Sequence, residues 1–543
     1  MNVIEIFGES SRRHPDQIAI ADGRAGRERT TTFAGLDRQS RQIAALLLRE
    51  GLQPGDGVVV FVPMSAELYA IVAALLRLAM VPVFVDPGAW RETLDRAVAS
   101  MPLRAFIGVP AACAMRLLVP ALRRVPKVFV VGAFFPGAVA LRAARALAPS
   151  QHVESVAPDR PGLVTFTSGS TGRPKGVVRS HGVLAATHRI LSAHLELAAG
   201  ETDVALLPIV VLANLGCGVG SLIPDGNLTR PGAIDARRLA RQIDAWSPTG
   251  MVASPALLER LADEALGRGA RFESLRRVVV GGAPVFPRVL DKLADVAPAA
   301  RIRALYGATE AEPMAMLDRN EFGAEERRAM QRGQGLLAGR PIGDVRMRVL
   351  RDRVGEPCGP WTRGQFEGAC IAAGRVGEIV VSGEHVVVGY LGDEGNRELT
   401  IRVDEQWWHR TGDAGCLDAS GRLWLHGSCR ARVELDGGFR YPLAVDAALS
   451  DHAALARSTL VRHDGKVLLV VQPRGDLPAA VRESVVSGVA WSGADELVVV
   501  RRMPLDRRHG AKIDHPQLLR LLEARHWLLR EPIERADTTV RAP

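Results

Sequence analysis

Lysine is scarce in this chain of 543 residues, and closely paired cysteines are missing. Only five of its 69 basic residues are lysine, at positions 127, 175, 292, 466 and 512. The six cysteines show no CxxC spacing, which argues against a structural zinc site and a disulfide framework and fits a reducing, cytoplasmic setting. The net charge of +9 is scattered without runs of like charge, so we expect no nucleic-acid partner.

Signals for export and for membrane insertion are also weak. The N-terminus has no basic segment followed by an apolar one, so we expect no secretory signal peptide. Residues 204–224 carry no charge and are numerous enough to span a bilayer. Pro208 and three glycines make this stretch a poor helix, so we predict a buried strand followed by a loop and no integral membrane segment.

Alternating strand and helix patterns fill the first 430 residues. Short β-branched runs, such as residues 58–63 and 163–167, alternate with amphipathic helical patterns such as residues 33–50. This alternation predicts an α/β fold with mostly parallel sheets. Further along, the pattern changes to short strands and turns, and the end of the chain predicts a small α+β unit. We place the boundary so that the domains are 1–428 and 429–543.

The clearest motif is a segment rich in glycine and hydroxyl groups after a predicted strand. It reads Thr-Phe-Thr-Ser-Gly-Ser-Thr-Gly-Arg-Pro-Lys-Gly over residues 165–176. Glycine lets backbone N–H groups approach an anion, and hydroxyl groups and Lys175 add donors for phosphate. The spacing differs from that of the Walker A phosphate-binding loop, GxxxxGK[ST], so the segment is not of that type. The residues predicted to bind phosphate here are Thr167, Ser168, Gly169, Ser170, Thr171 and Gly172.

Four further motifs follow along the chain. They are Gly281-Gly282-Ala283-Pro284, Tyr306-Gly307-Ala308-Thr309-Glu310, Arg410-Thr411-Gly412-Asp413 and the segment around Lys512. In this order, and with the phosphate segment, they resemble the adenylate-forming superfamily of acyl-CoA synthetases, firefly luciferase and nonribosomal-peptide adenylation domains. The resemblance implies ATP-dependent conversion of a carboxylic acid into an acyl-adenylate. It also implies a large N-terminal domain with a β-rich subdomain and a mobile C-terminal lid.

The resemblance implies how the nucleoside half of ATP binds. The ring of Tyr306, beside Gly307, is expected to stack on adenine, and Asp413 is expected to hold the ribose hydroxyls. The turn expected to contact the adenine edge comprises Gly282, Ala283 and Pro284.

The same resemblance implies four catalytic residues. Thr309 is expected to bind the α-phosphate, and Glu310 to ligate Mg²⁺ as a hard oxygen donor. Lys175 and Lys512 supply positive charge, Lys512 from the lid. The reaction brings two anions together, so cations and oriented N–H donors are needed to offset charge and fix an in-line geometry.

Some stretches resemble one branch of the superfamily, the olefin-pathway β-lactone synthetases. Among them are residues 83–88, 105–110, 223–225, 229–231, 254–258 and 508–512. The resemblance implies a fatty or polyketide-like β-hydroxy acid whose own hydroxyl closes a β-lactone and expels AMP, and it implies partner enzymes of a pathway. Two alternatives stay open: an acyl-CoA or acyl-carrier-protein ligase that uses an external thiol, and a nucleotide-binding pseudoenzyme or scaffold.

Two positions depart from the superfamily pattern. Ser428 follows Gly427 at the interdomain hinge, where the family has an arginine, so either Arg430 or Arg432 replaces its contact with ribose or phosphate, or adenylation is weak. The segment after Pro208 lacks the aromatic residue or histidine often found there. That segment is interpreted as an apolar wall for an acyl chain or as plain core.

Overall fold

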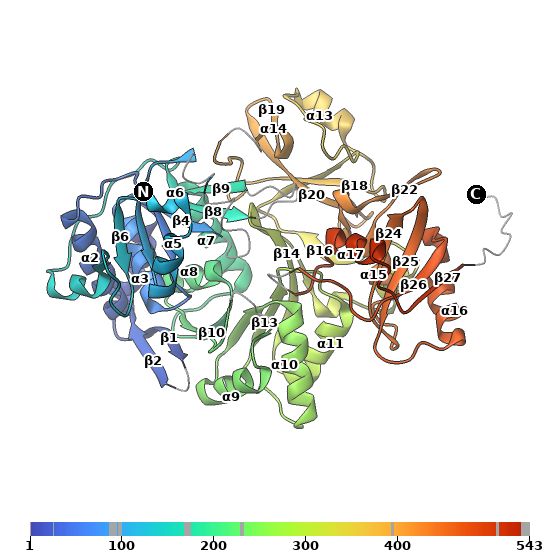
Figure 1. The fold of residues 1–543 in the computed structure, drawn as a ribbon, viewed down its shortest axis with the longest axis horizontal. Coiled ribbons are helices and arrows are strands. Elements are labelled where there is room, and N and C mark those ends of the chain that lie inside the picture. The colour runs from blue at the N-terminus through green and yellow to red at the C-terminus, as the bar shows by residue number, and fades with distance from the viewer. Residues whose placement is uncertain are drawn as a thin grey trace.

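The computed structural model describes residues 2–24, 27–85, 100–167, 175–228, 233–392, 396–506 and 510–533, together with Asp95. These residues form an α/β protein in which two large sheets with helices on their faces are followed by a smaller β-containing unit (Figure 1). The predicted fold class is confirmed.

A seven-stranded sheet lies in the N-terminal part of the molecule. Its strands are β3 (Gly57–Phe61), β4 (Val81–Val85), β5 (Leu103–Gly108), β6 (Lys127–Val130), β7 (Val139–Ala140), β8 (Pro161–Thr167) and β9 (Lys175–Ser180). They follow the order β7-β6-β5-β3-β4-β8-β9, parallel except for the antiparallel pair β8 and β9. Val58, Val59 and Val60 are all buried, as a strand covered by helices on both faces requires.

A fourteen-stranded sheet crosses the centre of the molecule. Its strands are β1 (Ile18–Arg24), β2 (Arg27–Thr32), β10 (Thr202–Ala205), β11 (Gly220–Leu222), β12 (Gly250–Ala253), β13 (Arg277–Gly281), β14 (Arg301–Ala308), β15 (Ala311–Asp318), β16 (Leu336–Pro341), β17 (Arg346–Leu350), β18 (Gly377–Ser382), β19 (Thr400–Val403), β20 (Gln406–Leu417) and β21 (Leu423–Ser428). The run β1-β11-β10-β12-β13-β14 is parallel, whereas β14 to β21 pair antiparallel. The strand-and-turn region predicted from the sequence therefore continues the α/β sheet.

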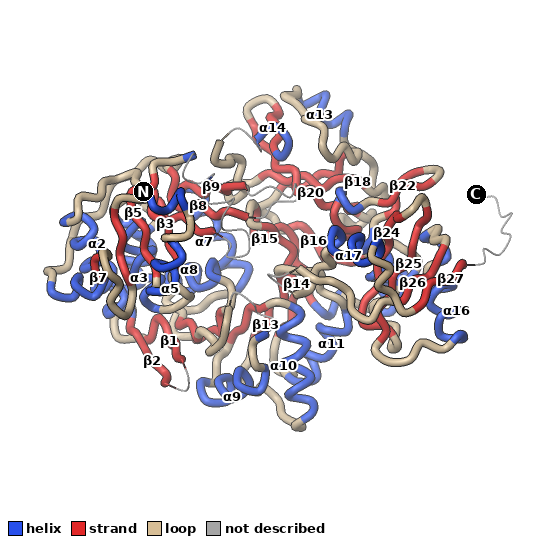
Figure 2. Tube along the Cα trace, in the orientation of Figure 1, coloured by secondary structure: helices blue, strands red, loops and turns tan. Residues whose placement is uncertain are grey.

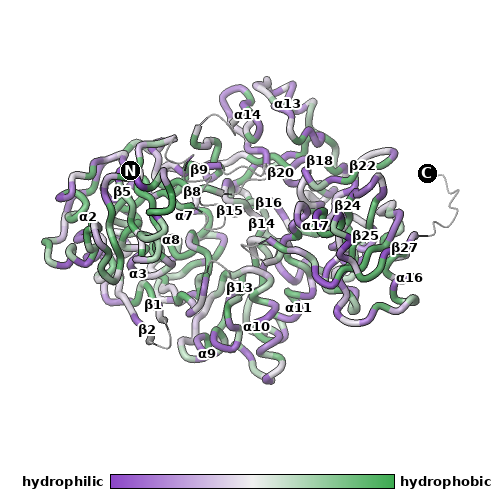
Figure 3. The backbone as a smooth tube through the Cα atoms, in the orientation of Figure 1, coloured by the Kyte–Doolittle hydropathy of each residue, from purple (hydrophilic) through white to green (hydrophobic). Residues whose placement is uncertain are grey.

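Helices cover both large sheets (Figure 2). They are α1 (Ile4–Arg13), α2 (Phe33–Arg49), α3 (Ala66–Arg77), α5 (Pro110–Arg116), α6 (Pro120–Arg123), α7 (His181–Leu195), α8 (Pro208–Cys217), α9 (Ala236–Trp246), α10 (Pro255–Gly267), α11 (Pro287–Val296), α12 (Ala324–Gln331), α13 (Arg363–Ala369) and α14 (Asn396–Leu399). Local signals begin several of them: the hydroxyl of Thr32 accepts from Gly35 N at 3.1 Å at the start of α2. Figure 3 shows apolar residues concentrated along the inner strands and helices.

The last part of the chain forms a separate four-stranded sheet. Its strands are β24 (Leu455–His463), β25 (Lys466–Pro473), β26 (Glu496–Val499) and β27 (Leu529–Pro532). The hairpin of β24 and β25 turns at Asp464 and Gly465, both with positive φ, as a tight two-residue turn requires. Helices α15 (Pro442–Ala448) and α16 (Ala479–Gly488) pack on one face and α17 (His515–Glu523) packs on the other. The short strands β22 (Val433–Leu435) and β23 (Gly438–Arg440) precede this sheet.

The prediction for residues 204–224 is wrong in one respect. The strand there is β10, but a helix, α8, follows it in place of the predicted loop. Pro208 occupies the first turn of α8, where its missing N–H costs nothing, and Gly218, with a φ of 71°, follows its last residue. The proline and glycine thus delimit the helix. Within the described ranges, no helix has the length and apolar character needed to cross a membrane.

Candidate active site

A cavity of about 2660 Å³ lies where the two large sheets meet the C-terminal unit. It brings together predicted residues from five separate parts of the chain. The predicted residues that line it are Lys175, Gly282, Ala283, Pro284, Tyr306, Gly307, Thr309, Glu310, Asp413 and Lys512. Residues 168–172 of the predicted phosphate segment, and the side chain of Thr167, lie outside the described residues.

Tyr306 and Asp413 form a hydrogen-bonded pair between two separate strands of the central sheet. The Tyr306 hydroxyl, on β14, donates to Asp413 Oδ2, on β20, at 2.9 Å. Burial raises the pKa of Asp413, while the charge of Lys512 and the bond from Tyr306 lower it. Both side chains line the cavity next to the turn at Gly282, where a φ of 86° favours glycine. The pair offers a ring face and a carboxylate to one ligand.

Glu310 lies in the turn between β14 and β15. Its Oε1 accepts a hydrogen bond from the hydroxyl of Tyr390 at 3.0 Å, and its carbonyl accepts from Val387 N at 2.7 Å. The preceding residue, Thr309, is held from the other sheet, because Arg179 on β9 donates to its carbonyl oxygen at 2.6 Å. The turn is therefore fixed in the cavity wall, with the carboxylate of Glu310 facing the cavity.

Lys175 is the first residue of β9, and its side chain is only 9% exposed. Its Nζ lies 3.8 Å from Glu398 Oε2 and 5.9 Å from the centre of the Tyr390 ring. Burial lowers the pKa of Lys175, and the nearby carboxylate of Glu398 opposes that effect. Among the described residues, Nζ has no hydrogen-bond partner. A buried ammonium with unused donors is suited to an anion.

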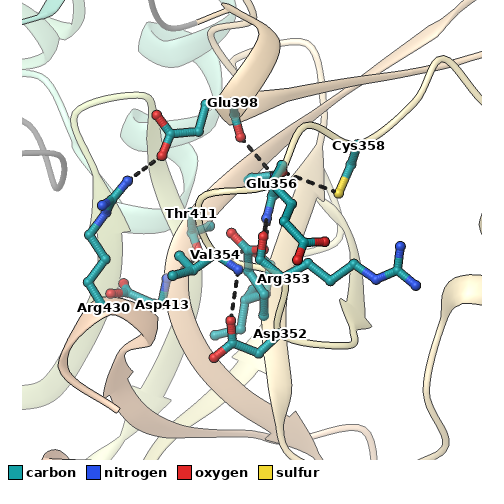
Figure 4. Close-up of polar contacts among 12 residues, drawn as sticks. Asp352, Arg353, Val354, Glu356, Cys358, Glu398, Thr411, Asp413 and Arg430 are labelled. Carbon is teal, nitrogen blue, oxygen red and sulfur yellow. Dashed lines mark hydrogen bonds and ion pairs between the residues drawn. The ribbon is translucent and has the colours of Figure 1, made fainter.

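The two candidate arginines both follow Ser428 at the hinge, but they pair with different carboxylates. Ser428 ends β21, and its hydroxyl accepts from Arg430 N at 3.3 Å. The Arg430 guanidinium pairs with Glu398, beside Lys175 (Figure 4). Arg432 pairs instead with Asp352 Oδ1 at 2.5 Å, away from these groups. Of the two, Arg430 is the one whose partner carboxylate lies beside Lys175, and neither arginine is among the residues that line the cavity.

Lys512 approaches the cavity from the C-terminal unit on an exposed loop. Its backbone N donates to Asp506 Oδ1 at 2.8 Å, and Asp506 N donates to the Lys512 carbonyl at 2.8 Å. Lys512 lines the same cavity as Asp413, and its charge lowers the pKa of that carboxyl, against the effect of burial.

Part of the cavity wall is apolar. Helix α8 contributes Ile209 and Leu212 to its wall, and Leu207 precedes the helix. Val72 on α3 and Ile223 after β11 also line this part. These side chains offer an apolar surface that suits an alkyl or aryl group, although the charged residues Asp22, Arg29 and Glu67 also line the cavity.

The residues present fit ATP with Mg²⁺. The buried ammonium of Lys175 suits a phosphate, and the Tyr306–Asp413 pair suits a nucleoside. In the described part of the chain, no group of three or more His, Cys, Asp or Glu side chains could hold a metal ion. A lone carboxylate such as Glu310 is consistent with Mg²⁺, which is commonly held by one or two carboxylates together with substrate phosphates.

Sequence reasoning missed three residues at or beside the cavity that contact predicted ones. They are Arg179, Tyr390 and Glu398, which contact Thr309, Glu310 and Lys175 respectively. Each contact joins segments that are far apart in the chain. Nothing in the local sequence around these residues signals the contact, so only the fold reveals it.

Comparison with known proteins agrees with this geometry. The sequence pattern of the AMP-binding enzyme family matches residues 7–391, so the chain belongs to that family. The chain is 32% identical to the olefin beta-lactone synthetase of Xanthomonas campestris pv. campestris, over 95% of this chain and 96% of that protein. The corresponding protein of Stenotrophomonas maltophilia is also 32% identical, over 95% of this chain and 97% of that protein.

A solved structure supports the fold. The amide bond synthetase McbA from Marinactinospora thermotolerans superposes with a TM-score of 0.76 at 22% identity, covering 96% of this chain and 99% of that one. The resemblance to adenylate-forming enzymes and to β-lactone synthetases inferred from the sequence is thereby confirmed.

Proposed function

We propose that the chain uses ATP to convert a β-hydroxy acid into an acyl-adenylate, and that the acid's own hydroxyl then closes a β-lactone. The products are the lactone, AMP and pyrophosphate. The observation that carries the proposal is that Lys175, Glu310, Asp413 and Lys512 line one cavity, to which α8 contributes apolar side chains. The full-length similarity to two olefin beta-lactone synthetases supports the second step.

The nucleoside would bind at the Tyr306–Asp413 pair. The ring of Tyr306 would stack on adenine, with Gly282, Ala283 and Pro284 along the adenine edge and Gly307 beside the ring, and all five residues line the cavity. Stacking on an aromatic ring and a carboxylate for two hydroxyl groups suit the flat and polar parts of adenosine.

The phosphates would lie between Lys175, Arg430 and the segment 167–172, with Thr309 at the α-phosphate. The acid's carboxylate attacks the α-phosphorus, and the bond to pyrophosphate breaks. Lys512, from the other side, would offset the charge that gathers as two anions meet. Mg²⁺, held by Glu310 and phosphate oxygens, would supply further charge neutralisation there.

The acyl part would lie against the apolar part of the wall along α8. Once the adenylate forms, the β-hydroxyl oxygen bonds to the acyl carbon, the bond to AMP breaks, and the hydroxyl proton is released. A well-placed hydroxyl attacks its own acyl group with a large entropic advantage, so no external nucleophile is required.

The division into residues 1–428 and a lid of residues 429–543 belongs to the same proposal, with the hinge at Ser428. It is supported by the separate core of the C-terminal sheet. We also propose a cytoplasmic location, since all six cysteines are free, and action alongside enzymes that deliver the acid and consume the lactone.

Acid-dependent exchange of labelled pyrophosphate into ATP tests the first step. Exchange that requires both Mg²⁺ and a long-chain β-hydroxy acid is the expected result. AMP release that requires coenzyme A or an acyl-carrier thiol would instead favour the ligase alternative. ATP binding without exchange on any acid would favour a nucleotide-binding pseudoenzyme.

A further inference from the structure

The carboxylate of Glu398 lies between two cations that the proposed function assigns to the phosphates of ATP. Its Oε1 accepts from the Arg430 guanidinium, and its Oε2 lies 3.8 Å from Lys175 Nζ. Arg430 comes from the hinge and Lys175 from the start of β9, so Glu398 joins two separate parts of the site. Figure 4 shows Glu398 directed toward Arg430.

The backbone that carries Glu398 is fixed independently of these ion pairs. Its carbonyl oxygen accepts from Arg410 Nη1 at 3.0 Å. Arg410 is itself 2% exposed and its Nη2 bonds Glu378 Oε2 at 2.5 Å. Because Arg410 lies on β20, three residues before Asp413, the short helix α14 is attached to the strand that also carries the proposed ribose carboxylate. The backbone position from which the Glu398 side chain extends is therefore set by the fold.

The groups around Lys175 leave its donors available. Besides Glu398, the charged or titratable groups that act on it are Arg430, Glu310 and His409, and the Tyr390 ring lies against it. The distance of 3.8 Å to Glu398 is an ion-pair distance and too long for a hydrogen bond. The carboxylate thus balances the charge of the buried ammonium without using its N–H groups.

We propose that Glu398 is a positioning residue that holds Arg430 and Lys175 in the orientation in which they contact the phosphates. This rests on the proposed function, because it takes phosphate as the ligand of both cations. The carboxylate also repels phosphate, so its removal has opposing effects on ATP binding. In the transfer of the adenylyl group to the acid, the orientation of the cations decides the rate. Greater mobility of Arg430 and Lys175 should therefore lower that rate.

The test compares Glu398→Ala and Glu398→Gln in acid-dependent pyrophosphate exchange and in ATP binding. We expect Glu398→Ala to lower kcat about 10- to 100-fold while the Kd for ATP changes less than about fivefold. Glu398→Gln keeps an acceptor for Arg430 and should be intermediate. Asp352→Asn, which weakens the neighbouring Arg432 ion pair of the hinge, is the matched control and should keep a rate near wild type.

A double-mutant cycle separates positioning from a merely structural role. If Glu398 acts through Lys175, then Glu398→Ala costs much less in a Lys175→Ala background than in the wild type. Equal costs in both backgrounds, or a wild-type rate in Glu398→Ala, would overturn the proposal. Thermal unfolding identifies a variant that does not fold, and Glu398→Gln then carries the test. Failure of the wild-type protein to exchange with any acid would count against the proposed function instead.

Discussion

The two lysines in the cavity are presented in opposite ways. Lys175 begins a buried strand, is 9% exposed, and lies at ion-pair distance from Glu398. Lys512 is exposed on a loop of the C-terminal unit, and its hydrogen bonds among the described residues run through its backbone to Asp506. Lys175 is thus part of the N-terminal sheet, whereas Lys512 belongs to the separate C-terminal unit. This difference fits the proposed function, in which Lys175 of residues 1–428 binds the phosphates and Lys512 of the lid supplies charge for the chemical step.

Removal of the lid lysine is expected to have the largest effect. Lys512→Ala should lower acid-dependent pyrophosphate exchange about a thousandfold, because it removes a charge aimed at the reacting groups. Its exposure means that the thermal unfolding temperature should not change. Lys466→Ala, on the same unit but paired with Glu496 outside the cavity, is the matched control. Exchange near wild type in Lys512→Ala would remove this lysine from the mechanism.

Glu310→Gln tests the part of the site that residues 1–428 provide. The amide keeps an acceptor for the Tyr390 hydroxyl but loses the charge that Mg²⁺ requires. We expect a rate about a hundredfold lower and a much weaker response to added Mg²⁺. A magnesium titration of the exchange rate measures both, and a wild-type titration curve in the variant would contradict this assignment.

Asp506→Ala tests whether the position of Lys512 depends on the hydrogen bonds within its loop. The Asp506 carboxylate accepts from the backbone N–H groups of Ala511, at 3.0 Å, and Lys512, at 2.8 Å. Its loss should let the lysine move and lower kcat roughly tenfold, with little change in the Kd for ATP. A change in the Kd for ATP as large as the change in kcat would contradict the view that Asp506 positions Lys512 for the chemical step only.

The smallest predicted effect concerns pH. In the proposed function the ionised form of Asp413 would accept from the ribose hydroxyls, so affinity for adenosine should be complete above the pKa of Asp413 and be lost as pH falls through it. Burial raises that pKa and the Tyr306 hydrogen bond lowers it. In Tyr306→Phe the pKa should rise, so the loss of affinity begins at a higher pH. Adenosine binding measured against pH avoids titrating a phosphate, and superimposable curves would refute the idea.

Much of this architecture could be predicted from the sequence. The strands predicted at 58–63 and 163–167 are found as β3 and β8, because continuous apolar runs are a local signal of a covered strand. The helix α8 was missed, since Pro208 and Gly218 signal a break without showing that they delimit a helix. Local signals thus identified most elements but not this one.

The site was predictable only in part. The motifs that contain Lys175, Glu310, Asp413 and Lys512 are recognisable from residue types and order. The groups that hold them are not, because Arg179, Tyr390 and Glu398 reach their partners across the fold. Which hinge arginine pairs with the carboxylate beside Lys175 also depends on geometry: Arg430 and Arg432 are two residues apart but pair with Glu398 and Asp352 respectively.

The most direct test is product analysis. The protein is incubated with ATP, Mg²⁺ and a racemic long-chain β-hydroxy acid, with and without coenzyme A, and the products are identified by mass spectrometry. The account predicts a β-lactone, AMP and pyrophosphate in equal amounts without coenzyme A. A thioester that forms only with coenzyme A, and no lactone in either case, would contradict it.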